Sequence, residues 1–257
     1  MLSDQTVKDS LDLVVSVYKG FREELMLHYG NRSFTEKADT SWVTEEDEKI
    51  ERALQARLAE AFPTLGFRGE ETGQHNSAEQ FWLVDPIDGT SLYVRGIWGC
   101  TNMAALVDGD TTVAAVIYDF VNDECYTAIR GQGAYKNDEP IRVSDRSSKQ
   151  SMILVESKHF EQYGPALNEA GMFNVEPMYS AGHGFLLVAS GKIEARIQIE
   201  AFGKDYDYAP GALLVAEAGG TLVTFDSKPY RYDTLDFAAS NAEVAEDIAR
   251  IIKDARQ

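Results

Sequence analysis

The chain has 257 residues, of which 44% are apolar, and it carries 42 acidic against 24 basic residues, a formal net charge of -18. This apolar fraction supports a substantial core, and the negative charge argues against nucleic acid or an anionic membrane as the main partner. The sequence shows no leader-like or membrane-spanning apolar run, and Cys100 and Cys125 form no metal-ligand spacing. We therefore expect a soluble, cytoplasmic protein.

The first half of the chain predicts two helices followed by strands. Apolar residues recur at helical spacing from Leu11 to Leu25, and this helix ends near Gly30. A polar loop over residues 32–41 precedes a second helix, which Thr44 and the acidic residues after it begin. Alternating or apolar runs between turns then predict an antiparallel meander of four strands at 81–84, 101–107, 112–118 and 124–129.

The second half alternates the two kinds of element. Strands are predicted at 152–156, 193–199 and 221–224, and helices around 162–170, 182–190, 209–218 and 242–255. No repeat, low-complexity tract or Pro/Gly-rich linker separates independent domains. We predict one α/β domain over residues 1–257, with an N-terminal half of about 1–145 and a C-terminal half of about 146–257.

The stretch from Trp82 to Thr90 is the most informative in the chain. An apolar run ends in Asp85 and Asp88, and a Gly-Thr pair follows at once. Because Pro86 fixes its own φ and favours an extended residue before it, the strand is expected to close at Asp85. Carboxylates held on a rigid corner suit Mg²⁺, and the amides of the Gly-Thr pair can point at an anion if a helix begins there. Taken alone, the spacing is equally compatible with a surface Asp-Gly turn.

Three further acidic features stand beside this motif. Glu70 and Glu71 lie in a glycine-flanked turn ahead of the central strand, although paired glutamates in a loop usually face solvent. Asp207 precedes an apolar helical run and is predicted to be its N-cap, a position from which a carboxylate can also point into a pocket. Lys37 and Asp47 form the third feature, for which loop polarity and helix capping are the alternative explanation.

Taken in order, these motifs resemble the inositol monophosphatase family of lithium-sensitive, magnesium-dependent phosphatases. The resemblance spans essentially the whole chain and rests on three separated motifs: 43–47, then 69–71 with 82–90, then 206–207 with 218–220. It implies a layered α-β-α-β-α sandwich with the site between the two halves. It also implies a homodimer and a magnesium-dependent phosphomonoesterase that acts on a small soluble phosphate.

The resemblance implies metal ligands residue by residue. Glu70, Asp85 and the carbonyl of Ile87 match the ligands of one Mg²⁺, while Asp85, Asp88 and Asp207 match the ligands of a second. A weaker third ion is implied at Glu70. Two nearby metal ions lower the pKa of water, clamp a phosphoryl group and stabilise the leaving alkoxide, so no protein nucleophile is required.

The resemblance also implies catalytic and substrate-binding residues. Thr90 paired with Asp47 matches the residues that orient the attacking water, Glu70 assists them as a metal ligand, and Lys37 matches a loop lysine that adds positive charge nearby. The residues on the substrate side match a phosphate-gripping turn and a hydroxyl-binding pocket: Gly89, Thr90, Ser180, Ala181, Glu200 and Asp207.

Several residues depart from the family pattern. Ser41 stands where the family usually has Asp, and Tyr206 stands where it usually has Trp. Pro210 replaces a small residue in the first helical turn, where its missing amide would be unpaired in any case. Asp205 competes with Asp207 for the ligand role, and the spacing to the following Glu-Ala-Gly-Gly run favours Asp207.

The residues around the predicted pocket are compatible with several substrates. Glu200 matches a glutamate that binds substrate hydroxyls, which favours a polyol phosphate, whereas Tyr179 and His183 depart from the pattern of the pocket. Inositol 1-phosphate is the first guess and histidinol phosphate the main rival, followed by fructose 1,6-bisphosphate and nucleotide phosphates. The alternative of another class is a non-catalytic descendant that binds a phosphometabolite or a partner.

Overall fold

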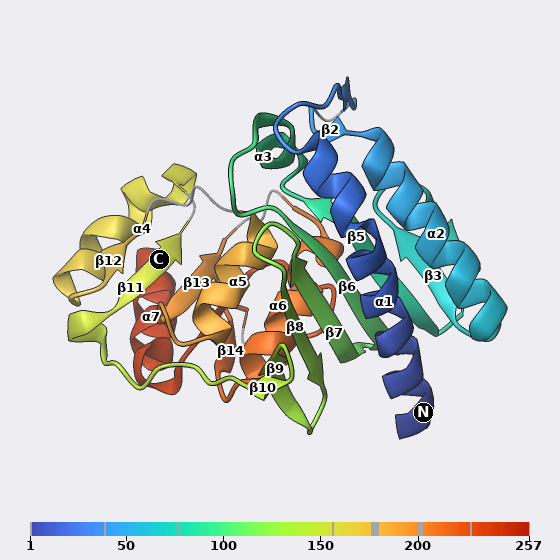
Figure 1. The fold of residues 1–257 in the computed structure, drawn as a ribbon. Helices are drawn as coiled ribbons and strands as arrows, with labels where there is room; N and C mark the ends of the chain where they lie inside the picture. Colours follow the sequence, from blue (N-terminus) through green and yellow to red (C-terminus); the bar gives the residue numbers. More distant parts are fainter. Residues whose placement is uncertain are drawn as a thin grey trace.

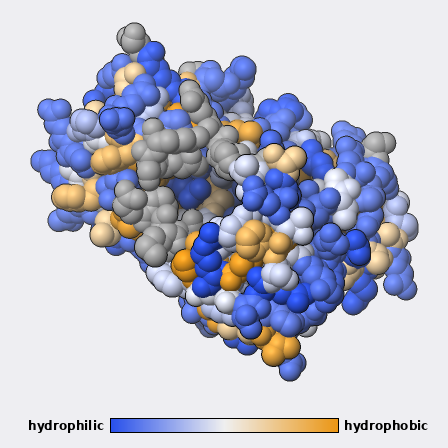
Figure 2. Space-filling model, turned by 90° about the horizontal axis from the view of Figure 1, so that it is seen from above, coloured by the Kyte–Doolittle hydropathy of each residue, from blue (hydrophilic) through white to orange (hydrophobic). Residues whose placement is uncertain are grey.

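Two large sheets and three layers of helices alternate through the molecule (Figure 1). The structure is a computed structural model and describes residues 2–38, 40–76, 78–155, 157–175, 180–199, 203–226 and 228–256. Hydrophilic residues cover most of the face seen from above (Figure 2). Within the described ranges, no helix is long and apolar enough to cross a membrane.

The first sheet has eight strands in the order β10-β9-β8-β7-β6-β5-β3-β4. Their bounds are β3 Gly66–Gly69, β4 Gly73–His75, β5 Gln80–Asp88, β6 Thr101–Asp108, β7 Thr111–Asp119, β8 Glu124–Ile129, β9 Gly133–Lys136 and β10 Glu139–Pro140. The pairs from β5 to β8 are antiparallel, so the predicted meander is confirmed, and β3 joins β5 in parallel.

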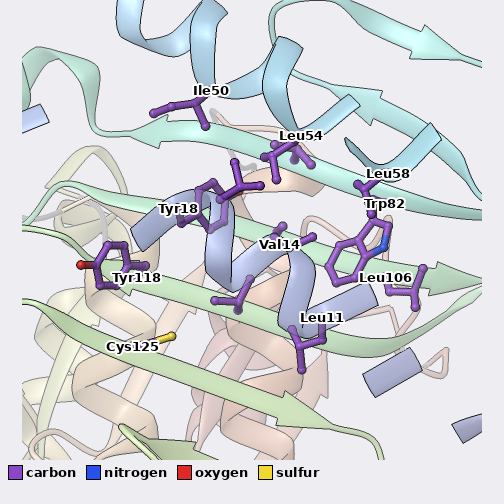
Figure 3. Packing of buried hydrophobic residues seen from close by; sticks show 14 of the residues in the cluster. Leu11, Val14, Tyr18, Ile50, Leu54, Leu58, Trp82, Leu106, Tyr118 and Cys125 are labelled. Carbon is purple, nitrogen blue, oxygen red and sulfur yellow. The ribbon is translucent and has the colours of Figure 1, made fainter. Parts of the chain in front are cut away.

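Two long helices, α1 (Asp4–His28) and α2 (Glu45–Ala61), cover one face of this sheet. Figure 3 shows Val14 and Tyr18 of α1 and Leu54 of α2 packed with Trp82 of the sheet in one apolar cluster. Helix α1 begins before the predicted apolar stripe because Ser3 caps it, accepting a hydrogen bond from the Thr6 amide at 3.1 Å. This face carries one apolar cluster, and a second cluster fills the opposite face of the sheet, where the second half of the chain packs.

The opposite face of the first sheet packs on α5 (Ala181–Ala189) and α6 (Asp205–Glu217), which also contact the second sheet. That sheet has the order β12-β11-β13-β15-β14. Its strands are β11 Met152–Val155, β12 Phe173–Asn174, β13 Ala195–Gln198, β14 Thr221–Thr224 and β15 Phe237–Ser240. Helices α4 (Ser157–Glu169) and α7 (Ala242–Ala255) form the last layer, so the predicted α-β-α-β-α arrangement is confirmed.

Three small elements surround the end of β5. Strands β1 (Thr35–Glu36) and β2 (Trp42–Val43) form an antiparallel hairpin within the predicted polar loop, and helix α3 (Thr90–Arg95) follows the central motif directly. A short 3₁₀ helix, Ser148–Gln150, leads into the second sheet. The hairpin and α3 were not predicted as regular elements, because each is only a few residues long.

Candidate metal centre

Three carboxylates meet where β5 ends and α6 begins. Oxygen atoms of Asp85, Asp88 and Asp207 lie within 4.8 Å of one another. Asp85 and Asp88 belong to β5 and are only 1% and 5% exposed, whereas Asp207 lies in the first turn of α6. We call these three residues the carboxylate cluster. It joins the first sheet to the central helix layer.

A bulge in β5 places Asp85 and Asp88 on the same side of the sheet. Asp85 pairs with Met103 and Asp88 pairs with Thr101, so β5 has one more residue than β6 between these pairs. Residues three apart in a regular strand face opposite sides, and the extra residue removes that difference. Pro86 lies in this irregular stretch, where its missing amide breaks no regular pair. The strand therefore continues to Asp88, and its predicted end at Asp85 is wrong.

Asp88 is held by donors from both halves of the chain. Its carboxylate accepts hydrogen bonds from the amides of Ala181 at 3.2 Å and Gly182 at 2.6 Å, and from Thr101 Oγ1 at 3.2 Å. A Cβ atom on Gly182 would lie 2.5 Å from Thr101 Oγ1 and 2.9 Å from Asp88 Oδ2, so only glycine allows this close approach. The start of α5 is thus fastened to the end of β5.

The first turn of α6 separates the roles of its two aspartates. Lys204 is the N-cap and Asp207 is the third helical residue, accepting the Lys204 amide at 2.5 Å, so the predicted N-cap position of Asp207 is wrong. The prediction failed because a carboxylate can bond the same amides from inside the first turn. Asp205 forms an ion pair with Arg68 and is not a member of the carboxylate cluster, which agrees with the preference for Asp207.

The electrostatics of the cluster suit a cation. Burial raises the pKa of Asp85 well above its usual range, and the neighbouring carboxylates of Glu70 and Asp88 raise it further. Burial likewise raises the pKa of Asp88, and it raises the pKa of Asp207 to about 8. Asp85 Oδ1 is buried without a hydrogen-bond partner. The three carboxylates repel one another, and one buried oxygen receives no hydrogen bond. Both properties suit the binding of a hard divalent cation such as Mg²⁺.

Glu70 lies in the turn between β3 and β4 and is paired with the hairpin. Lys37 Nζ, in the β1–β2 connection, donates to Glu70 Oε1 at 2.7 Å and to Glu71 Oε1 at 2.6 Å. The structure therefore brings Lys37 and Glu70 together. Glu70 is not part of the carboxylate cluster, although its charge acts on Asp85.

Asp47 and Thr90 meet beside the cluster. Thr90 Oγ1 lies 3.4 Å from Asp47 Oδ1 and also donates to the carbonyl of Ile87 at 3.0 Å. Asp47 is fully buried in the first turn of α2, where its Oδ2 atom accepts from the amide of Thr44 at 2.7 Å and from its hydroxyl at 2.6 Å. Burial raises the pKa of Asp47 to about 8 despite these hydrogen bonds.

Four of the predicted phosphate and substrate residues lie at the starts of two helices: Gly89 and Thr90 at α3, and Ser180 and Ala181 at α5. Gly89 is the N-cap of α3, with a φ of 83°, and Ser180 is the N-cap of α5. The Ala181 amide is directed at Asp88. Glu200 and Tyr179 lie outside the described residues.

Two buried polar residues of β13 were not singled out in the sequence. Arg196 and Gln198 are 8% and 1% exposed, and Arg196 Nη2 donates to Gln198 Oε1 at 3.1 Å. Their alternation with Ala195 and Ile197 was the available signal, because it places a cation on one face of a buried strand. The positive charge of Arg196 acts on both Asp88 and Asp207, and it opposes the rise in their pKa.

A five-layer α/β fold with a buried carboxylate cluster between its sheets defines the class of protein. The model of the inositol monophosphatase family matches residues 8–257, and the chain belongs to this family, whose members are metal-dependent phosphatases. Inositol monophosphatase 1 of Solanum lycopersicum is 30% identical, covering 90% of this chain and 86% of its own. The Nus factor SuhB of Xylella fastidiosa is 29% identical, covering 95% and 94%.

Solved structures show the same fold. The Thermotoga maritima inositol monophosphatase TM1415 superposes with a TM-score of 0.85 at 23% identity, over 96% of this chain and 98% of that one. The extragenic suppressor protein suhB of Bartonella henselae superposes with a TM-score of 0.83 at 26% identity, over 95% and 98%.

Proposed function

We propose that this protein is a Mg²⁺-dependent phosphomonoesterase that hydrolyses a small soluble phosphate. The observation that carries the proposal is the carboxylate cluster of Asp85, Asp88 and Asp207, in which one buried oxygen has no donor. These three residues would hold the ions, with Glu70 and the Ile87 carbonyl as further ligands for a second or third ion. When bound, the ions lower the pKa of water and neutralise charge on the phosphoryl group.

Asp47 and Thr90 orient the attacking water in this proposal. The Thr90 hydroxyl lies between Asp47 Oδ1 and the carbonyl of Ile87, both of which can accept its proton. A hydroxyl fixed in this way presents its lone pairs in one direction and accepts a hydrogen bond from water. Asp47 is itself fixed by Thr44, so the pair has little freedom.

Lys37 lies on the side of the site that the β1–β2 hairpin forms. Its ammonium group pairs with Glu70 and Glu71, so the hairpin delivers one positive charge to two carboxylates beside the cluster. Glu70 can serve as a metal ligand when that pairing loosens. The amides of Gly89 and Thr90 would bind the phosphate, and Ser180, Ala181, Asp207 and Glu200 would line the substrate side.

Inositol 1-phosphate is the first substrate to assay and histidinol phosphate the second. Tomato relatives at 30% and 31% identity are named inositol monophosphatases, and a Thermotoga maritima relative at 25% is named fructose-1,6-bisphosphatase/inositol-1-monophosphatase. Fructose 1,6-bisphosphate and nucleotide phosphates complete the panel. A homodimeric state and a cytoplasmic location stay predictions.

A second candidate function is binding of a phosphometabolite or a partner without turnover. It is favoured by one observation, that relatives at 29% and 33% identity are named Nus factor SuhB. The carboxylate cluster is complete in this chain, which favours hydrolysis. The two functions differ in whether phosphate is released.

Phosphate release from the panel, with Mg²⁺ and with a chelator, tests the proposal. We expect Mg²⁺-dependent release, and a kcat/KM for one compound that exceeds the others by about 100-fold, equivalent to about 2.7 kcal/mol. Asp85→Asn should abolish release while the protein stays folded. Hydrolysis that persists in Asp85→Asn would show the site assignment to be wrong, and silence of the folded wild-type protein across the panel would favour the binding function.

A further inference from the structure

Arg196 is a buried cation on the face of β13 that looks toward the central helices. Its neighbours Ala195 and Ile197 belong to the apolar cluster shared with α4 and α7, so Arg196 and Gln198 point the other way. The guanidinium lies 5.2 Å from the centre of the Phe185 ring in α5. It therefore rests on the helix whose first turn binds Asp88.

The first turns of α5 are shaped around Arg196 as well as around Asp88. A Cβ atom on Gly184 would lie 2.5 Å from Arg196 Nη1, and one on Gly182 would lie 2.9 Å from Asp88 Oδ2. Two glycines spaced two residues apart thus admit a guanidinium and a carboxylate to the same stretch of helix. Arg196 therefore packs against the same helix turns as Asp88, in space that a side chain at Gly184 would fill.

The guanidinium has far fewer partners than its burial demands. Among the described residues, no carboxylate lies within ion-pair distance of it, and its one hydrogen bond to a side chain goes to Gln198. Arg196 Nε is buried with no partner. Burying an arginine without a paired anion is costly, and none of the described side chains supplies that anion to Arg196.

The carboxylate cluster does not supply that anion once metal is bound. The charge of Arg196 acts on Asp88 and Asp207, but both of these residues belong to the carboxylate cluster. Divalent cations would neutralise these carboxylates and leave the charge of Arg196 uncompensated. The guanidinium presents a planar set of donors that matches a phosphate or carboxylate oxygen pair.

We propose that Arg196, positioned by Gln198, binds a second anionic group of the substrate. The protein then prefers phosphate monoesters that carry a further phosphate or carboxylate over those that carry hydroxyls alone. This inference rests on the proposed phosphatase function and names the substrate class of the same site. It moves doubly anionic compounds such as fructose 1,6-bisphosphate ahead of inositol 1-phosphate in the order of assays.

Binding of phosphonates, whose carbon–phosphorus bond is not hydrolysed, tests the inference without turnover. Calorimetry with Mg²⁺ in large excess would compare alkylphosphonates, ω-carboxyalkylphosphonates and α,ω-alkane bisphosphonates of two to six carbons. We expect at least one doubly anionic ligand to bind about tenfold or more tightly than the alkylphosphonate of equal length. The carboxylate and bisphosphonate series distinguish the two kinds of second anion.

Two substitutions remove the effect in different ways. Arg196→Gln removes the cation, and Gln198→Glu keeps the cation but supplies an internal carboxylate for it, so both should reduce the preference to less than about twofold. Arg196→Lys should retain part of it, because the charge stays while the planar fork is lost. Arg250→Gln, on the exposed face of α7, is the control that keeps the full preference.

Each outcome decides the inference. Equal binding of singly and doubly anionic ligands, with Mg²⁺-dependent phosphate release intact, would overturn the role of Arg196 and leave the phosphatase function standing. A preference that survives both Arg196→Gln and Gln198→Glu would also overturn it. Failure of every phosphonate to bind, together with no phosphate release, would overturn the phosphatase function and the inference with it.

Discussion

The Oδ2 atom of Asp88 lies 2.6 Å from the amide nitrogen of Gly182. This hydrogen bond crosses from the last residue of β5 to the first turn of α5, so the second half of the chain is fastened to the first at a metal-ligand candidate. Because a buried carboxylate that accepts amide hydrogen bonds is fixed in orientation, the geometry of the cluster depends on the glycine.

Gly182→Ala should weaken metal binding. The added Cβ would meet Thr101 Oγ1, Met103 Sδ and Asp88 Oδ2 within 2.9 Å, so Asp88 or the helix must move. We expect a loss of stability of about 1–3 kcal/mol and a Mg²⁺ dissociation constant raised about tenfold, measured by denaturant unfolding and calorimetry. Gly20→Ala in α1, where nothing lies within 4 Å of the new Cβ, is the control and should be neutral or stabilising. Identical behaviour of the two variants would show that the close approach at Gly182 does not shape the metal centre.

Asp207→Asn and Asp205→Asn should separate the two aspartates of α6. Binding of Mg²⁺ at 100 times its dissociation constant stabilises the folded state by about 2.7 kcal/mol. We expect the Mg²⁺-induced rise in melting temperature to disappear in Asp207→Asn and to persist in Asp205→Asn, which loses only the ion pair with Arg68. Thermal unfolding with and without Mg²⁺ measures both. Loss of the response in Asp205→Asn alone would reverse the assignment.

The metal-free protein should lose stability as the pH rises from about 5 to 8. Asp47 and Asp207 each have a pKa of about 8 in the folded, metal-free state, chiefly because of burial, against about 3.9 in an unfolded chain. Between these values the folded state retains protons that the unfolded state has released, so stability falls by up to about 1.4 kcal/mol per pH unit for each group. Melting temperatures in chelator should decline across this range.

Mg²⁺ supplies the comparison for that experiment. Bound cations favour the ionised carboxylates, so the decline should flatten when Mg²⁺ is saturating. Parallel pH profiles with chelator and with Mg²⁺ would mean that these carboxylates do not titrate together with the metal site.

Trp42→Ala should loosen the hairpin that carries Lys37. Trp42 stacks on Phe34 with ring centres 3.6 Å apart, and the Arg95 guanidinium of α3 lies 4.1 Å from the Trp42 ring centre. This stack holds the hairpin against α3, so its loss should weaken the hydrogen bond from Lys37 to Glu70. We expect faster amide hydrogen exchange over residues 35–43 and about tenfold lower activity at limiting Mg²⁺. Phe173→Ala, an exposed residue on β12, should change neither; equal effects of both variants would argue against the stack.

The sequence contained most of the fold because its helices and central strands carry strong local patterns. The predicted helices around 182–190 and 242–255 lie within one residue of α5 and α7. Strand β15, which pairs with both β13 and β14, was missed because Phe237 to Ser240 contain no β-branched residue and only one large apolar side chain. Its place in the sheet comes from pairing across the chain, which local patterns do not record.

At the site, too, local motifs could be predicted from the sequence and contacts across the chain could not. Asp85 and Asp88 share one short motif, so their partnership was readable, but the bulge that aligns them depends on pairing with β6. Arg196 was missed because its importance arises only when β13 lies behind α5. The role of a charged residue in a strand depends on the groups it faces, and these are known only from the fold.

Crystals grown with Mn²⁺ in place of Mg²⁺ would show whether the carboxylate cluster binds a metal ion, because anomalous scattering locates the ion itself. We expect an anomalous peak between Asp85, Asp88 and Asp207, with an oxygen of each at about 2.0–2.6 Å, and no peak there in Asp85→Asn. A Mn²⁺-saturated crystal with no peak among these three residues would contradict the claim that they form a metal centre.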